Sequence, residues 1–441
     1  MVCLSTHLPE SNMPHTLAGW LNYLESLHPK AIALGLERVE QVKRRLNLDP
    51  EFPVIVVGGT NGKGSVCAML ESILHAAGYR VGSYTSPHLL HYNERVRINK
   101  QQAGDSELCA SFDKIEQVRR AVPSGQSEIP LTYFEFGTLA AMQCFIEHKV
   151  DVAVLEVGLG GRLDAVNAFD NDCAVIASVD IDHTDYLGDS REQIAFEKAG
   201  IFRRASVAIC ADSDVPQAIF NQAQQIGADL WCIGSEFGCT PHQGQWDYRS
   251  RLGARRALPY PALRGAFQLH NASAALAALD ALKDRLPVSM EAVRRGLVGV
   301  QLAGRFQFVP GKPALILDVA HNPHAARSLA QNLSSLPSCP HTYAVFAMLR
   351  DKDIAGVVAA MDAHIDSWLA TGIESDRGAT VREMEQKLEQ GRVRGEIRTF
   401  NNIAEALRYA YNAAGENDRI LVFGSFYTVA EAMIAAGLKV V

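Results

Sequence analysis

Short runs of apolar residues alternate with stretches in which apolar residues recur every three or four positions. Residues 54–57 are all β-branched and apolar, which is typical of a strand buried on both faces. Apolar residues then recur at helical spacing from Val66 to Ala77, and Gly78 follows as a residue that commonly ends a helix. Further buried strands are predicted at residues 150–155, 173–179, 207–210 and 230–233. Repeated strand–helix units of this kind predict a mainly parallel sheet with helices on both faces.

The alternation is interrupted once and then resumes. Between about residues 236 and 262 Gly, Gln, Arg and Pro dominate, so we expect loops or a small antiparallel excursion there. A second strand–helix series begins near residue 305, with strands predicted at residues 314–317, 342–346, 368–370 and 420–423. We place a domain boundary within 298–304, which gives domains of residues 1–300 and 301–441. The length of 441 residues also favours two domains.

Composition narrows the class of protein. The chain is 48% hydrophobic and 21% charged, as in soluble globular proteins, and its net charge of −7 gives no general attraction for nucleic acid or anionic membranes. No apolar run is long enough for a membrane span, and the first residues do not resemble a secretory signal. The 9 cysteines form no CxxC pair, so we expect neither disulfides nor structural zinc. These features favour a cytoplasmic protein.

The strongest local motif follows the first predicted strand and precedes a helix. It consists of Gly58, Gly59, Thr60, Asn61, Gly62, Lys63, Gly64 and Ser65. Glycines permit a tight turn whose N–H groups point inward, and the helix N-terminus adds a positive dipole end. Lys63 supplies a charge for the β- and γ-phosphates, and Ser65 supplies a hydroxyl near a phosphate-bound metal. The spacing differs from GxxxxGK[ST], because Gly64 separates the lysine from the serine. A plain glycine-rich turn with an exposed lysine is the alternative interpretation.

Together these patterns predict an α/β fold, with a P-loop-type, mainly parallel sheet domain followed by a smaller Rossmann-like α/β domain. Glu156 ends a predicted strand, and an acid at such a tip faces the ligand crevice and suits Mg²⁺. His183 is predicted at the tip of the next strand; a lone histidine is more often structural, but two strand tips beside a phosphate loop favour a metal ligand. Lys198 lies on a helix predicted to begin after Ser190, with Gln193 placed for a capping box. From its spacing alone, Lys198 is a solvated helix lysine.

Ordered segments along nearly the whole chain resemble the Mur ligase superfamily, and within it the bacterial bifunctional dihydrofolate synthase/folylpolyglutamate synthase family. The matching segments are GTNGKGS (59–65), TSPHL (85–89), LTYFEFGT (131–138), LEVGLGGRLDA (155–165), DIDHTDYLG (180–188), FEKAGI (196–201), LHNASAA (269–275), GRFQ (304–307), LDVAHNPHA (317–325) and GSFYTV (424–429).

The resemblance implies roles that spacing does not. It implies Mg²⁺ ligands at Ser86, Glu156 and His183, and carbamylation of Lys198, which would create an anionic ligand for a second Mg²⁺. Lys63, His183 and Lys198 are the implied catalytic residues. The implied ATP contacts are Asn61, Gly62, Lys63, Gly64, Ser65, Asn271, Arg305 and Asp318, with His321 and Asn322 adjoining them. The implied contacts of the pterin-bearing substrate are Ala31, Ile32, Ala33, Leu34, Thr132, Tyr133, Phe134, Glu135, Leu163, Asp164 and Ala165. Related enzymes often carry an acid where Ala33 stands.

The implied activity is that of an ATP-dependent ligase in folate biosynthesis. It would activate the carboxylate of dihydropteroate or a folate as an acyl phosphate and join it to L-glutamate, including γ-glutamyl extension of tetrahydrofolates. We expect a monomer whose partners are these small molecules. Three alternatives remain at this point: a monofunctional folylpolyglutamate synthase, a P-loop kinase or NTPase, and a non-catalytic nucleotide-binding protein.

Overall fold

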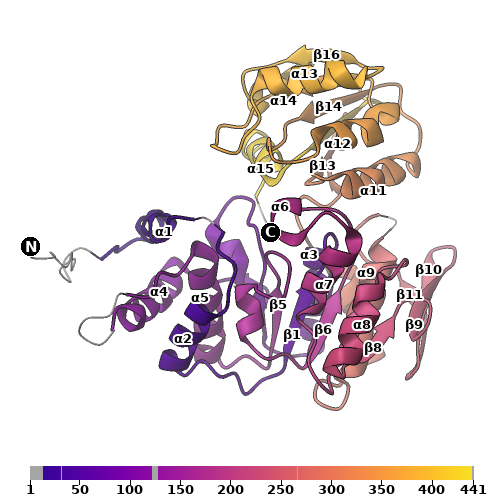
Figure 1. Ribbon diagram of the computed structural model, residues 1–441. Coiled ribbons are helices and arrows are strands. Elements are labelled where there is room, and N and C mark those ends of the chain that lie inside the picture. The colour runs from indigo at the N-terminus through magenta and orange to yellow at the C-terminus, as the bar shows by residue number, and fades with distance from the viewer. Residues whose placement is uncertain (1–12, 31, 122–127, 266, 440–441) are drawn as a thin grey trace, which may run out of the picture.

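The computed structural model describes residues 13–30, 32–121, 128–265 and 267–439. Within these residues the chain forms two α/β units, each built around its own mainly parallel sheet, with the second unit placed over one end of the first (Figure 1). The predicted fold class is confirmed.

The first unit contains an 8-stranded sheet in the order β4-β3-β2-β5-β1-β6-β7-β8. Six of these strands, β2, β5, β1, β6, β7 and β8, pair in parallel. The other two, β3 and β4, extend the sheet beyond β2 in antiparallel fashion. The strands are β1 (Val54–Gly58), β2 (Val81–Tyr84), β3 (Val96–Ile98), β4 (Gln101–Gln102), β5 (Val152–Glu156), β6 (Cys173–Ile176), β7 (Val207–Cys210) and β8 (Asp229–Cys232).

The helices of the first unit cover both faces of this sheet. They are α1 (Leu17–Ser26), α2 (Glu37–Leu46), α3 (Lys63–Ala76), α4 (Asp105–Arg120), α5 (Tyr133–Glu147), α6 (Thr184–Leu187), α7 (Arg191–Ala199), α8 (Gln217–Ile226), α9 (Gln268–Ala281) and α10 (Met290–Val298). Alternate residues of β1 point to opposite faces, as strand geometry requires. Val54 and Val56 join the core beneath α5 and α7, whereas Ile55 and Val57 join the core beneath α3 and α9.

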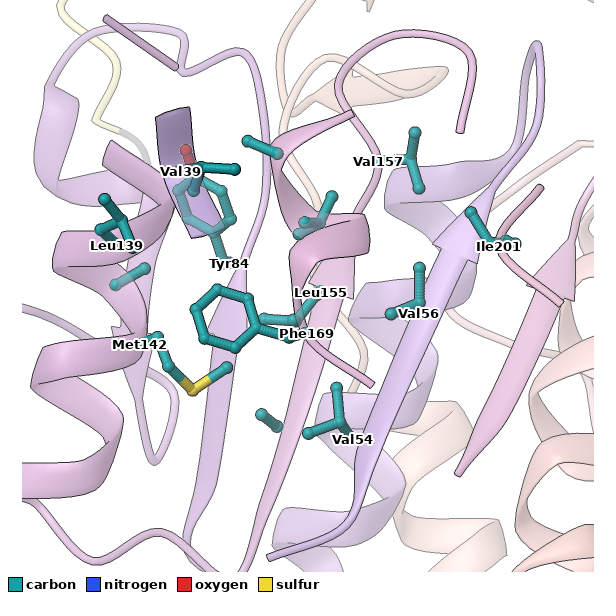
Figure 2. Close-up of a cluster of buried hydrophobic side chains, with 14 of the residues drawn as sticks. Val39, Val54, Val56, Tyr84, Leu139, Met142, Leu155, Val157, Phe169 and Ile201 are labelled. Atoms are coloured by element: carbon teal, nitrogen blue, oxygen red, sulfur yellow. The ribbon is translucent and has the colours of Figure 1, made fainter. Parts of the chain in front are cut away.

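The first of these cores surrounds the aromatic ring of Phe169. Figure 2 shows Tyr84, Met142 and Leu155 gathered around this ring, with Val54 and Val56 farther along the face. All are buried. The core therefore holds β1, β2, β5 and α5 in one rigid arrangement, and the loops at their ends carry most of the predicted site residues.

Of the two structures predicted for residues 236–262, loops or an antiparallel excursion, the chain forms the second, a 3-stranded sheet at one side of the first unit (Figure 1). Its strands are β9 (Phe237–Pro241), β10 (Gln245–Ser250) and β11 (Gly253–Pro259). Phe237, Trp246 and Tyr248 are fully buried in the core that α3, α9 and α10 share.

The second unit is a 6-stranded sheet in the order β12-β13-β17-β14-β15-β16, parallel except for β12. Its strands are β12 (Gln307–Val309), β13 (Ala314–Asp318), β14 (Thr342–Phe346), β15 (Ser367–Ala370), β16 (Glu396–Thr399) and β17 (Arg419–Phe423). Its helices are α11 (Pro323–Ser334), α12 (Ile354–Met361), α13 (Val381–Gly391), α14 (Ile403–Ala413) and α15 (Phe426–Ala435). No helix in the described part of the chain is long and apolar enough to cross a membrane.

Most predicted strands are found within one or two residues of their predicted ends, but one is clearly shorter. β6 ends at Ile176 rather than at residue 179. The following residues leave the sheet to bind the phosphate loop: the Thr60 N–H donates to the Ser178 carbonyl at 2.7 Å, and the Asn61 N–H donates to the Ser178 hydroxyl at 3.0 Å. The sequence pattern also missed β2, β3, β4, β12 and β16, which are short or lie at sheet edges.

Candidate active site

A cavity of about 680 Å³ lies between the two units, where the carboxyl ends of both sets of parallel strands meet. Such edges are where ligands bind in open α/β sheets. All the predicted ATP contacts and metal ligands line this cavity, as does His321. Among the predicted substrate contacts, only Tyr133 does not line it, and Ala31 lies outside the described residues.

The phosphate loop connects β1 to α3, and its backbone depends on glycine at Gly62. Gly62 has φ +87°, in the left-handed region, and an added Cβ would lie 2.6 Å from Oδ1 of Asn271. The Lys63 ammonium donates to the carbonyls of Gly59 at 3.0 Å and Thr60 at 3.2 Å, so the lysine is held over the loop. These contacts place a cation and a helix N-terminus at one point, which is what a polyphosphate requires.

Glu156 is the last residue of β5, as the sequence predicts, and its side chain is buried. Its Oε2 accepts a hydrogen bond from the Ser86 N–H at 3.2 Å, so two predicted metal ligands are adjacent. Burial raises the pKa of Glu156, and the charges of Lys63 and Arg305 act in the opposite direction. The resulting oxygen donors suit a hard cation that takes its remaining ligands from phosphate and water.

His183 does not stand at a strand tip, in contrast to the prediction. Because β6 ends early, His183 precedes the short helix α6 in a left-handed conformation with φ 52°. Burial lowers the pKa of His183 to about 4, the nearby Asp182 carboxylate opposing this shift. The ammonium of Lys352, from the second unit, lies 3.5 Å from its Nε2 and 2.7 Å from Oδ1 of Asp182.

Lys198 is buried rather than solvated, which corrects the interpretation from helical spacing. The predicted helix start is right, since Ser190 caps α7 and Gln193 completes the capping box. Burial, followed by the nearby charge of Lys63, lowers the pKa of Lys198 to about 7. Asp164 is similarly buried, and this raises its pKa to about 7. With a pKa of about 7, a substantial share of Lys198 is the neutral amine near pH 7, and this is the form that reacts with CO₂.

The second unit contributes Arg305 and Asp318 to the cavity. Asp318, at the end of β13, accepts from the N–H groups of Phe306 and Ala320, both at 2.8 Å. Burial raises the pKa of Asp318 and lowers that of Arg305, and their opposite charges reduce both shifts. Asn271 faces the phosphate loop from α9 and donates to Gln268 at 3.1 Å.

Hydrogen bonds between amides connect the phosphate loop directly to the second unit. Asn61 and Asn322 exchange hydrogen bonds at 3.2 Å, and Asn61 Nδ2 also contacts Nδ1 of His324 at 2.8 Å. Asn322 in addition donates to Asp182 at 3.1 Å. Asp182, His324 and Lys352 were missed by the sequence analysis. Lys352 could have been noticed in the Asp-Lys-Asp sequence beyond the apolar run of β14, by the same reasoning that identified Glu156.

The predicted substrate segments meet at the far end of the cavity. The Gly35 N–H donates to the Leu163 carbonyl at 3.3 Å, which joins the first and third segments. Arg38 forms an ion pair with Glu135 at 2.8 Å and donates to the Ala33 carbonyl at 2.8 Å, which joins the first and second. The Glu135 carboxylate thus binds Arg38 and caps α5. Tyr133 packs against Tyr92 and Arg95 instead of lining the cavity.

Family models match both units of the chain. The Mur ligase middle domain matches residues 57–279, and the Mur ligase glutamate ligase domain matches residues 304–426. The chain belongs to the Mur ligase family.

Within this family the similarity to one group extends over the whole chain. It is 45% identical over 426 residues to the dihydrofolate synthase/folylpolyglutamate synthase of Escherichia coli (strain K12), covering 96% of each sequence. A structure of E. coli FolC in complex with DHPP and ADP superposes with a TM-score of 0.90 at 45% identity, covering 98% of this chain and 99% of that one.

A second structure, of a bifunctional folylpolyglutamate synthase/dihydrofolate synthase with Mn, AMPPNP and L-glutamate bound, superposes with a TM-score of 0.88 at 44% identity. It covers 98% of this chain and 100% of that one. The predicted family and the predicted ligase class are confirmed by these matches.

Proposed function

We propose that this chain is an ATP-dependent amide ligase that joins L-glutamate to the carboxylate of dihydropteroate and of tetrahydrofolates. One observation carries the proposal: the phosphate loop, the buried Glu156 and the substrate segments of the first unit share one cavity with Arg305 and Asp318 of the second. Similarity to relatives whose structures contain DHPP, ADP, AMPPNP and L-glutamate supports the choice of ligands.

The first step is the attack of the substrate carboxylate on the γ-phosphate of ATP, which gives an acyl phosphate and ADP. Lys63 and the N-terminus of α3 hold the phosphates and offset the charge that develops on the transferred group. Asn61, Gly62, Gly64 and Ser65 complete the loop around the phosphates, while Asn271, Arg305 and Asp318 hold the rest of the nucleotide. The amine of glutamate then attacks the acyl carbon and expels phosphate.

Magnesium ions would neutralise phosphate charge and act as Lewis acids. Ser86 and Glu156 are adjacent oxygen donors beside Lys63, so they fit a cation bound together with phosphate. No three His, Cys, Asp or Glu side chains in the described ranges converge into a metal site of their own. A second site therefore requires a new donor, which a carbamate on Lys198 together with His183 would provide.

The remaining assignments belong to the same proposal. The pterin-bearing part of the substrate contacts residues 31–34, Thr132, Phe134, Glu135 and residues 163–165, where Phe134 packs over Gly158. Residues 1–300 and 301–441 act as two domains that close on ATP and shield the acyl phosphate from water. We further propose a cytoplasmic monomer.

Measurement of ADP release from purified protein tests the proposal. With ATP and dihydropteroate, addition of L-glutamate should accelerate ADP release and produce dihydrofolate, and tetrahydrofolate should also be extended. ADP release that is independent of both the folate substrate and glutamate would instead identify a kinase or NTPase. Turnover of tetrahydrofolate without any turnover of dihydropteroate would identify a monofunctional folylpolyglutamate synthase.

A further inference from the structure

Arg95 has an unusual position in the wall of the cavity. It ends a short 3-10 helix (Tyr92–Arg95), and its carbonyl accepts from the Thr85 N–H at 2.9 Å, beside the end of β2. Its guanidinium lies 5.5 Å from the ring centroids of both Tyr92 and Tyr133. Its Nε donates to Nδ1 of His88 at 2.8 Å. Two aromatic rings and one hydrogen bond therefore fix the orientation of this side chain.

The two terminal nitrogens of Arg95 remain available. The neighbouring carboxylate of Glu94 is turned away, since it accepts from the N–H groups of Leu89, Leu90 and His91 at 2.7–2.8 Å. Across the described part of the chain, Arg95 forms no ion pair and its terminal nitrogens make no hydrogen bond to the protein. A guanidinium held rigidly in this way presents a two-pronged donor that matches a carboxylate.

The other arginines that line the cavity lie against different groups. Arg305 faces Asp318 and Glu156, and Arg377 donates to Asp351 at 2.6 Å. Arg264 lies 4.7 Å from the ring centroid of Phe308, next to the residues around the start of α9. Arg95 differs from them in lying against Tyr133, within the predicted substrate segment at residues 132–135.

The position of Arg95 indicates which part of a substrate it meets. On one side it contacts Tyr133, the first residue of α5, in the segment proposed to contact the pterin. On the other side it holds His88, two residues beyond Ser86, whose N–H binds Glu156. Arg95 therefore lies between the pterin end of the cavity and the place where the carboxylate reacts.

The two proposed substrates differ in the carboxylates that they carry near the reacting group. Dihydropteroate has a single carboxylate, and that group reacts. A folate ends in a glutamyl residue whose γ-carboxylate reacts, so its α-carboxylate stands a fixed number of bonds from the reacting group. Each γ-linked glutamate added later presents an α-carboxylate at the same offset. A site that fixes the reacting carboxylate will therefore meet an α-carboxylate at one constant position, whatever the length of the tail.

We infer that Arg95 binds the α-carboxylate of the terminal glutamyl residue of folyl substrates, and so determines specificity for the glutamate-extension reaction but not for the dihydropteroate reaction. This inference rests on the proposed function. The single carboxylate of dihydropteroate is the reacting group, and it must lie at the phosphate site around Lys63. Dihydropteroate therefore offers Arg95 no second carboxylate.

The test compares Arg95→Met and Arg95→Lys with the wild-type protein and with Arg256→Met, which removes the same charge from the exposed part of β11. KM and kcat are measured for tetrahydrofolate and for dihydropteroate, and KM for glutamate is measured with dihydropteroate as acceptor. Calorimetry with tetrahydropteroate and tetrahydrofolate, which differ only in the glutamyl residue, gives a readout independent of turnover. Thermal unfolding with and without ADP checks that each variant is folded.

In Arg95→Met, KM for tetrahydrofolate should rise about 10- to 100-fold, the usual effect of losing a charged hydrogen bond. The preference of the protein for tetrahydrofolate over tetrahydropteroate should fall by the same factor, with the dihydropteroate reaction changed by less than about threefold. Arg95→Lys keeps the charge but not the two-pronged geometry. Its rise in KM should therefore be smaller and confined to the folyl substrate. Arg256→Met should match the wild type.

Three results would overturn the inference. Equal loss on both acceptors would mean that Arg95 only supports the fold or the pterin. A raised KM for glutamate with dihydropteroate as acceptor would mean that it binds the incoming amino acid. No change in either variant would mean that it binds no substrate. If the wild-type protein used neither acceptor, the proposed function itself would have failed, which is a separate outcome.

Discussion

Burial brings the pKa values of a base, Lys198, and an acid, Asp164, close to each other. Removal from water disfavours the charged form of each group, so the pKa of the lysine falls and that of the aspartate rises, both to about 7. Neither shift can be read from helical or strand spacing, because spacing does not report which side chains are covered by distant parts of the chain. For Lys198 the consequence is chemical, since only a neutral amine reacts with CO₂.

Carbamylation of Lys198 should therefore follow its lowered pKa. Below about pH 7 the ammonium dominates and little carbamate forms, whereas above it the neutral amine dominates and carbamate accumulates. In ¹³C-labelled bicarbonate, the wild-type protein should show a carbamate NMR signal that grows between about pH 6 and about pH 8.5. The signal should be absent in Lys198→Ala, and its absence from the wild-type protein at the upper pH would contradict the prediction.

The N-terminus of α5 illustrates how one helix end connects two of the proposed substrate segments. The Thr132 side chain accepts from the Glu135 N–H, and Glu135 accepts from the Thr132 N–H at 2.7 Å, which is a capping box. Glu135 also holds Arg38, which in turn holds the carbonyl of Ala33. Through Arg38, 97 residues away in sequence, the cap of one helix thus anchors a loop at the carbonyl of Ala33.

Removal of the Glu135 carboxylate should affect both stability and substrate binding. Glu135→Ala leaves Arg38 without its partner, and we expect a loss of roughly 2–4 kcal/mol in the free energy of unfolding, measured in urea. KM for dihydropteroate should rise because residues 32–34 lose their anchor, while KM for ATP should change little. Glu147→Ala, at the exposed end of the same helix, should cost less than about 1 kcal/mol. Equal effects of the two changes would contradict this account.

Residues of both units line one cavity, and Figure 1 shows the second unit placed over one end of the first. Asn322 reaches both Asn61 of the phosphate loop and Asp182 beside His183. Arg327 adds an ion pair with Asp180 at 3.0 Å. These contacts make the position of the second unit depend on the same segments that we propose bind the nucleotide, so nucleotide binding and closure are expected to favour each other.

Arg305→Ala tests the contribution of the second unit to the nucleotide site. Because Arg305 lies in the cavity and outside the two hydrophobic cores of its own unit, the variant should keep its thermal stability. ATP-dependent turnover should fall by about 10²-fold or more, since a charge that stabilises the phosphoryl group or positions the nucleotide is lost. Turnover equal to that of the wild-type protein would refute a role for Arg305 in closure over ATP.

Lys352→Met tests the contact between the units directly. Asp182 would lose its buried partner across the interface, so the closed arrangement should become less favourable. Small-angle scattering with AMPPNP should give a larger radius of gyration than for the wild-type protein, and KM for ATP should rise. Lys312→Met, which removes an exposed ion pair with Glu416 within the second unit, is the matched control and should behave as the wild type.

The local pattern was sufficient to predict β1, the phosphate loop, α3, Glu156 at its strand tip and the division into two strand–helix series. These features depend on neighbours in sequence: β-branched runs, glycines that permit a turn, and helical periodicity. Edge strands such as β12 and β16 were missed because they bury few side chains and so leave no apolar run. The end of β6 was misplaced because Ser178 leaves the sheet for hydrogen bonds to the phosphate loop, which no pattern within that segment records.

Most candidate site residues could thus be identified from local sequence motifs, because loops that bind phosphate must carry particular residues at particular spacings. The burial and the charged neighbours of each of these side chains, in contrast, were decided only by the tertiary structure. Burial of Lys198, the ion pair of Asp182 with Lys352 and the contact of Arg95 with Tyr133 all arise where separate segments of the chain meet. Electrostatic free energies depend on distance and on exclusion of water in three dimensions, and a linear pattern contains neither.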